Sequence, residues 1–186
     1  MRISTLLFIL TFLFQNNGNS QSIEELQSLK QTYDSIRTTN KNSQIILVRT
    51  IEEGLIKVTD GNWPENIVST YNILVKRGRT LIISIYPYSE SGDWSREHTY
   101  YFDSTEKLFA YNHKLNSFNN ICAEITKQNT LFYYNQFSNV LSKEYTIRDK
   151  DGVNLKDKNC IFNYPYNHQP YMNLEEIKNE EKLIGW

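Results

Sequence analysis

The sequence is short of several residue types and motifs, and each shortage excludes a class of protein. Seven Gly and four Pro in 186 residues argue against a disordered, low-complexity chain. The three histidines, His98, His113 and His168, are spaced too widely to match a compact zinc-binding signature. The chain also lacks a G-x-S-x-G motif, a G-x-G-x-x-G motif and a P-loop. A serine nucleophile elbow and a nucleotide-binding loop therefore have no support, and no cofactor is expected.

Long apolar runs are missing too, except at the N-terminus. Residues 3–14 are mostly apolar, follow Arg2 and precede Gly18 and Ser20. A positive start, a short apolar run and small residues at the last and third-last positions are typical of a secretory signal peptide. This pattern predicts cleavage after Ser20 and a secreted or periplasmic protein. The alternatives are a membrane anchor or a core helix, but about twelve residues are short for a bilayer span of roughly twenty.

Removing residues 1–20 from the 186 leaves 166 residues, which suits one exported domain over residues 21–186. The formal net charge is −1, or −2 without Arg2. This near-neutral balance gives no reason to expect nucleic acid or an anionic membrane as a partner. After the signal peptide, no segment is long and apolar enough to span a membrane.

Cys122 and Cys160 are the two cysteines of the chain. An exported protein meets an oxidising compartment, so the pair predicts a disulfide. The bridge would close a loop of about 38 residues and stabilise the fold by about 3–4 kcal/mol. The alternatives are two buried thiols, or a catalytic thiol beside His113 or His168, for which the sequence has no local signature.

Two helices and a series of strands follow from local patterns. Ser22 and Glu25 form a capping box before an apolar stripe, which predicts an amphipathic helix over residues 23–37. Asn173 and Glu176 predict a short C-terminal helix over residues 174–183. Strands separated by short polar turns are predicted at residues 44–51, 55–58, 67–76, 81–86, 98–111 (as a hairpin), 130–136 and 140–149. The fold class is therefore α+β, an antiparallel β-meander sheet with a helix packed on one face.

Two segments of the predicted sheet repeat one pattern. Tyr101–Phe109 and Tyr133–Leu141 both read as an aromatic strand, a turn begun by Asp or Asn, and an apolar strand. The pattern resembles the Y-x-D-x-x-G-x-L hairpin unit of MORN-like repeats and of exported bacterial β-meander proteins. The resemblance implies a structural or interaction surface and no catalytic role. Where that unit has Gly, this chain has Glu106 and Ser138, which adopt positive φ less freely.

No catalytic group stands out in the sequence. His98 and His113 are expected to face each other across a hairpin, and we interpret them as exposed cross-strand residues. Two carboxylates can hydrolyse glycosidic bonds. The available acids have no spacing that selects a pair, and a solvated face explains them: Glu52, Glu53, Asp93, Glu97 and Asp103.

Aromatic residues in loops are the better indication of function. Tyr-Pro-Tyr occurs twice, and two Trp residues lie in Gly-Asn-Trp-Pro and Gly-Asp-Trp-Ser. Rigid, exposed aromatic side chains are good interface anchors, although each could instead cover the edge of a small core. The candidate binding residues are Trp63, Tyr86, Tyr88, Trp94, Tyr164 and Tyr166. The sequence thus favours an exported, non-enzymatic module that binds a protein or a glycan. The alternatives are a small secreted hydrolase and an inhibitor or immunity-type protein that binds another protein.

Overall fold

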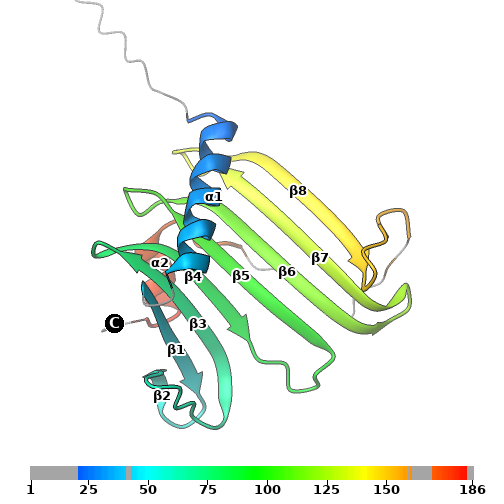
Figure 1. Cartoon of the computed structure of the whole chain (residues 1–186), viewed down its shortest axis with the longest axis horizontal. Coiled ribbons are helices and arrows are strands. Elements are labelled where there is room, and N and C mark those ends of the chain that lie inside the picture. The colour runs from blue at the N-terminus through cyan, green and yellow to red at the C-terminus, as the bar shows by residue number, and fades with distance from the viewer. Residues whose placement is uncertain (1–20, 41–42, 159, 161–168, 184–186) are drawn as a thin grey trace, which may run out of the picture.

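An eight-stranded antiparallel sheet with a helix on each face forms the protein (Figure 1). The computed structural model describes residues 21–40, 43–158, 160 and 169–183, so the predicted signal peptide lies outside the described residues. The elements are α1 (Ile23–Thr39), β1 (Gln44–Thr50), β2 (Gly54–Lys57), β3 (Ile67–Lys76), β4 (Arg79–Pro87), β5 (Trp94–Phe102), β6 (Leu108–Asn120), β7 (Ala123–Tyr134), β8 (Val140–Asp149) and α2 (Leu174–Glu180). The strand order β2-β1-β3-β4-β5-β6-β7-β8 is a meander in which β2 folds back outside β1. The predicted α+β fold class is confirmed.

The helix starts are set by the predicted caps. The Ser22 hydroxyl accepts a hydrogen bond from the Glu25 backbone N–H at 3.3 Å, and the Glu25 carboxylate accepts one from the Ser22 N–H at 3.1 Å. α1 continues two residues past the predicted end. α2 begins as predicted at its Asn173 cap but ends at Glu180, three residues early. The chain turns out of the helix there, because Lys182 has a φ of 47°.

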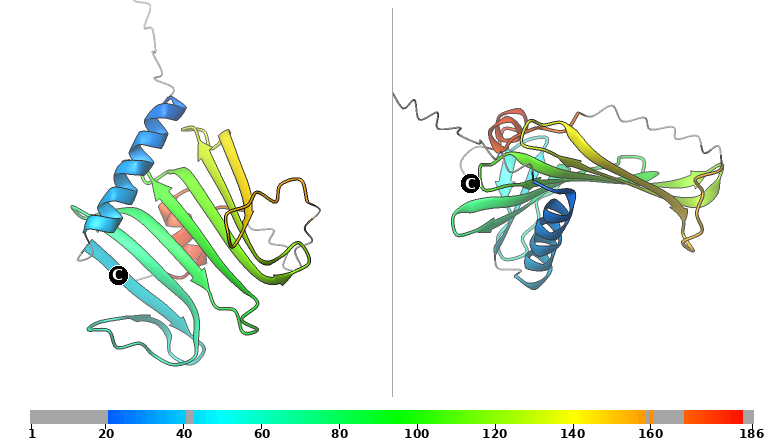
Figure 2. Two further views of the ribbon diagram at one scale, coloured as in Figure 1. Left: turned by 45° about the vertical axis from the view of Figure 1, so that its right-hand side comes forward. Right: turned by 90° about the horizontal axis from the view of Figure 1, so that it is seen from above.

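The helices lie on opposite faces of the sheet, which the sequence did not predict (Figure 2). Leu26 and Tyr33 of α1 pack with one cluster of buried side chains, which includes Tyr101. Leu174 and Ile177 of α2 pack with the cluster on the other face. Neighbouring strand residues point to opposite faces, so the aromatic run of β5 contributes to both cores. We call these two sides of the sheet the α1 face and the α2 face.

The repeated pattern forms two turns of the same geometry. The Asp103 carboxylate accepts hydrogen bonds from the backbone N–H groups of Thr105 and Lys107. The Asn135 side chain accepts the equivalent bonds from Phe137 and Asn139. The prediction that Asp or Asn begins each turn is confirmed.

The positions that replace glycine keep the conformation that glycine favours. Glu106 and Ser138 both have a φ of 63°. A third turn of this kind follows β8, where Asp149 bonds the N–H groups of Asp151 and Val153. Gly152, with a φ of 86°, occupies the left-handed position there.

The largest departure from the predicted strands is the hairpin of β6 and β7. The predicted strand 130–136 covers only the end of β7, which begins at Ala123. The part of the hairpin that was not predicted as strand is rich in Asn, Ser, Lys, Gln and Thr, a composition that gives little indication of a strand. Its pairing with β6 runs without a break from Ala110↔Tyr133 to Phe118↔Ile125.

A disulfide joins Cys122 to Cys160, as predicted, with a Cα–Cα distance of 5.3 Å. It ties the tip of the β6–β7 hairpin to the segment that follows β8. Among the described residues, no helix has the length and apolar character needed to cross a membrane.

Candidate functional site

The predicted aromatic residues occupy different environments. Trp63 and Tyr88 are 53% and 62% exposed. Tyr86 and Trp94 are partly buried, and the Arg96 guanidinium lies 5.0 Å from the Trp94 ring centroid. Tyr164 and Tyr166 lie outside the described residues. Of the four that belong to the described residues, Tyr88 lines a pocket.

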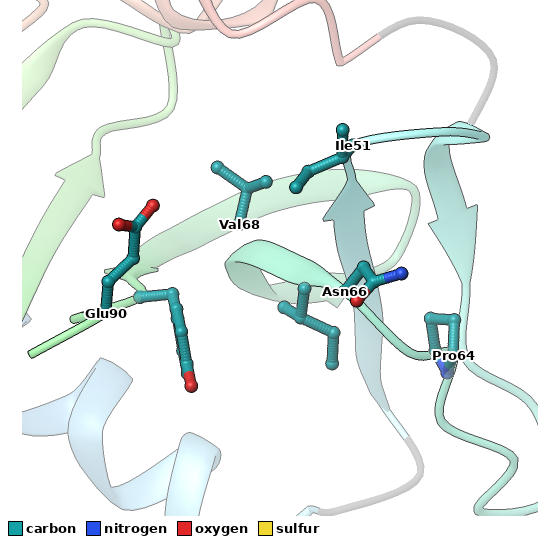
Figure 3. A pocket seen from close by; sticks show the side chains of 7 residues that line it. Ile51, Pro64, Asn66, Val68 and Glu90 are labelled. Atoms are coloured by element: carbon teal, nitrogen blue, oxygen red, sulfur yellow. The ribbon is translucent and has the colours of Figure 1, made fainter. Parts of the chain in front are cut away.

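This pocket, which we call the apolar pocket, has a volume of about 420 Å³ and lies where β1 ends, β3 begins and β4 ends (Figure 3). Its lining comes from three separate segments: Ile51, Pro64, Asn66, Ile67, Val68, Tyr88 and Glu90. Figure 3 shows Ile51, Val68 and Glu90 arranged around the hollow.

Backbone hydrogen bonds hold the three segments together. The Ile51 N–H donates to the Asn66 carbonyl at 3.3 Å, and the Tyr88 N–H donates to the Val68 carbonyl at 2.8 Å. Asn66 has a φ of 57°, a left-handed conformation that Asn tolerates better than most residues. Main-chain contacts therefore fix the three segments relative to one another.

The surroundings of the apolar pocket are exposed, apolar and acidic. Large apolar side chains in or beside it are strongly exposed: Ile51 (77%), Tyr88 (62%), Trp63 (53%) and Val68 (42%). Single exposed apolar residues are ordinary, but a group of them marks an interaction surface. Glu90 lines the pocket, and the adjoining residues 51–66 contain four acids and one base: Glu52, Glu53, Asp60, Glu65 and Lys57.

No family model matches the chain, and no curated protein or solved structure matches it either.

The second predicted tyrosine, Tyr86, belongs to a polar network under α1. Glu97 accepts hydrogen bonds from Tyr86 at 3.3 Å, from Thr99 at 2.8 Å and from Lys114 at 2.9 Å. Arg37 of α1 lies 3.7 Å from the same carboxylate. Burial acts to raise the pKa of Glu97, but the Lys114 hydrogen bond and charge outweigh it, so the pKa is lowered. This network fixes α1 on the sheet and holds Glu97 ionised.

A partly buried polar cluster on the α2 face fixes the end of α2. The Glu181 carboxylate accepts hydrogen bonds from Tyr71 at 2.8 Å and from Tyr171 at 3.0 Å. Arg49 of β1 donates to the Tyr71 hydroxyl at 3.1 Å. Burial raises the pKa of Tyr71, so its hydroxyl stays protonated and can donate to Glu181. The cluster therefore ties the end of α2 to β1 and β3.

The histidine prediction is half right. His98 pairs with His113 in the β5–β6 register, and their rings stack with centroids 4.8 Å apart. The expectation that both are exposed is wrong, because His98 is only 2% exposed and its Nδ1 lies 2.6 Å from the Tyr111 hydroxyl. His98 shares the α2 face with Tyr100 and Phe102, which belong to the core there.

The other catalytic alternatives find no arrangement in the structure. Both cysteines are in the disulfide, so a Cys–His nucleophile is contradicted. Within the described part of the chain, no three His, Cys, Asp or Glu residues converge as metal ligands. Asp103 is the turn residue described above, and Glu97 bonds Lys114.

Most of the pocket could not be identified from the sequence. Ile51 carried a weak signal, as the last apolar residue of the predicted strand 44–51, just before Glu52-Glu53-Gly54. Val68 and Asn66 had none, because their exposure depends on how β1, β3 and the end of β4 meet.

Proposed function

We propose that the protein is an exported, non-enzymatic binding module and that it docks a protein partner through the apolar pocket. The observation that carries the proposal is the coincidence of a hollow of about 420 Å³ with exposed Ile51, Val68 and Tyr88. The matching partner surface has one projecting apolar or aromatic side chain, surrounded by basic residues that face the acidic rim.

The energetics suit such an anchor. Fully burying one large apolar side chain contributes about 1.5–3 kcal/mol, and aromatic residues such as Tyr88 dominate many interfaces. The acids around the pocket would steer a basic partner and raise the association rate more than the final affinity.

The signal-peptide pattern and the disulfide both support export, since disulfides persist in oxidising compartments. The resemblance of the β5–β6 and β7–β8 turns to MORN-like units supports an interaction role over a catalytic one. An inhibitor or immunity-type protein is a special case of the same proposal, in which the basic partner is an enzyme. None of the described residues forms an arrangement that favours the hydrolase.

Affinity capture with matched variants tests the proposal. The immobilised chain 21–186 is offered native extracellular or envelope protein, beside the variants Tyr88→Ala and Tyr145→Ala. Tyr145 is a suitable control because it is a 40% exposed tyrosine on β8, at the opposite edge of the sheet. We expect a partner that wild type and Tyr145→Ala retain and Tyr88→Ala loses. A partner retained equally by wild type and both variants would contradict the pocket, and binding of neutral glycans alone would contradict a protein partner.

A further inference from the structure

A second hollow lies on the α1 face at the opposite edge of the sheet. It has a volume of about 380 Å³ and is lined by β6, β7, β8 and the turn after β8. We call it the basic groove after the cations in its lining, Lys114, Lys127, Arg148 and Lys150. The right-hand view of Figure 2 shows the orange segment after β8 bending toward the side that carries α1. That segment forms one wall, and Lys114 connects the groove to the Glu97 network.

Two of the cations face each other without a carboxylate between them. Lys127 and Arg148 are direct partners in the β7–β8 register, and like charges directly opposite destabilise a sheet. Lys114 is paired with Glu97 at 2.9 Å and Lys150 with Glu124 at 2.7 Å. Arg148 has no ion pair among the described residues, and Lys127 donates only to the Lys150 carbonyl at 3.5 Å. An anion placed between Lys127 and Arg148 would turn this repulsion into attraction.

The acid in the lining does not neutralise the pair. One Asp149 oxygen accepts the backbone N–H groups of Asp151 and Val153. The carboxylate is thereby held in the turn after β8 and has no ion pair with Lys127 or Arg148 among the described residues. The four cations of the lining outnumber it, so the groove keeps an excess of positive charge.

Amide groups complete the lining. The Asn129 side-chain oxygen is buried and has no hydrogen-bond partner within the described residues, and Asn116 donates to Ser95 at 2.9 Å. Amides offer both donors and acceptors, which suits sugar hydroxyls. The described lining contains no aromatic side chain, whereas sites for single-stranded nucleic acid stack bases on such residues.

We propose that the basic groove binds an acidic glycan, with a carboxylate or sulfate group between Lys127 and Arg148 and sugar hydroxyls on Asn129. The ligand differs from that of the apolar pocket, so the two proposals stand or fall separately. The paired cations select glycans that carry an anionic group, and the amides bind the hydroxyl groups of the sugar chain.

Titration of the disulfide-intact chain 21–186 at low ionic strength tests this proposal. The probes are a sulfated heparin oligosaccharide, a carboxylated oligogalacturonate, a neutral dextran and single-stranded DNA. We expect one of the two acidic glycans to bind and the dextran not to bind. Which of the two acidic glycans binds shows whether the groove selects sulfate or carboxylate. Lys127→Gln and Arg148→Gln should each weaken binding about tenfold, the effect of losing one good charge contact.

The matched control is Lys143→Gln. Lys143 is also on β8 and its loss changes the net charge equally, but its ammonium lies 5.3 Å from the Phe132 ring, on the α2 face. It should bind like wild type. Without ligand, Lys127→Gln should melt slightly above wild type, because the repulsion from Arg148 is gone. The proposal is overturned if neither acidic glycan binds, if Lys143→Gln weakens binding as much as Lys127→Gln, or if the DNA binds more tightly than both glycans.

Discussion

The apolar pocket and the basic groove lie at the same end of the strands but at opposite edges of the sheet (Figure 1). Loops and strand ends build the pocket, while regular strands and one turn build the groove. The pocket is apolar with an acidic rim, whereas the groove is polar and cationic. α1 and α2 pack on the two faces of the sheet, whereas β8 at its edge stays mostly exposed, so strand ends and the β8 edge are open to solvent. A near-neutral chain can therefore carry two surfaces of opposite charge, which net charge alone conceals.

Removal of the disulfide should distinguish the basic groove from the apolar pocket more strongly than any other change. Cys122 lies at the tip of the β6–β7 hairpin, and Cys160 follows the segment that forms the groove wall. Replacing both by Ser should lower the free energy of unfolding by about 3–4 kcal/mol, because the unfolded chain loses a constraint. Denaturant unfolding measures this loss.

The same variant also tests how the groove is held. At temperatures where it remains folded, it should lose acidic-glycan binding and keep the partner of the apolar pocket. Equal loss of both ligands would mean that the bridge supports the whole sheet and not the groove in particular.

The next largest effect should come from Glu97→Gln. Only 17% of the Glu97 side chain is exposed, and its loss leaves Lys114 and Arg37 without their shared carboxylate. We expect the free energy of unfolding to fall by about 1–3 kcal/mol. Lys114 would then add its charge to the basic groove, so glycan binding should strengthen while the fold weakens. The apolar pocket should not respond.

The pH dependence of wild type provides an independent check on this network. The pKa of Glu97 is lowered in the folded protein, from an ordinary value of about 4.3. Its stabilising contribution is therefore complete above that value and is lost as the pH falls through the folded pKa. Glu97→Gln should show a smaller loss of stability over this acidic range. Parallel curves for the two proteins would contradict the role assigned to the carboxylate.

The elements with local signals were predictable, and the sites were not. The Ser22–Glu25 box specified the start of α1, and Asp103 and Asn135 specified two turns. Burial of His98, by contrast, depends on which face of β5 carries the core. This information arises only when the strands are assembled.

The same limit applies to the two sites. Lys127 and Arg148 are far apart in the sequence and become neighbours only through the β7–β8 register. Ile51 and Tyr88 line one pocket only because the end of β1, the start of β3 and the end of β4 lie together. Pairing across strands is not encoded in either strand alone. The Tyr-Pro-Tyr pattern could therefore single out Tyr88, but no local pattern could bring it together with Val68 or indicate the groove.

Tyr88→Ala tests the apolar pocket and should change the free energy of unfolding less than Glu97→Gln does. Tyr88 is exposed, so stability should change by less than about 0.5 kcal/mol. Partner affinity should fall about tenfold to a hundredfold, as expected for losing an aromatic anchor. Glycan binding in the groove should stay at the wild-type value. A loss of stability comparable to that of Glu97→Gln would show that Tyr88 supports the fold and does not serve as an exposed anchor.

The smallest expected effect concerns the acidic rim. Glu90 lines the apolar pocket, and a rim charge acts mainly on the rate of encounter with a charged partner. Glu90→Gln should therefore slow association about twofold to threefold at low salt and leave dissociation unchanged. The difference should vanish at high ionic strength, because exposed charges are then screened. Stopped-flow or surface-binding kinetics at two salt concentrations measure both rates. Faster association in Glu90→Gln would mean that the partner is acidic, and the pocket and groove would then not differ in the charge they select.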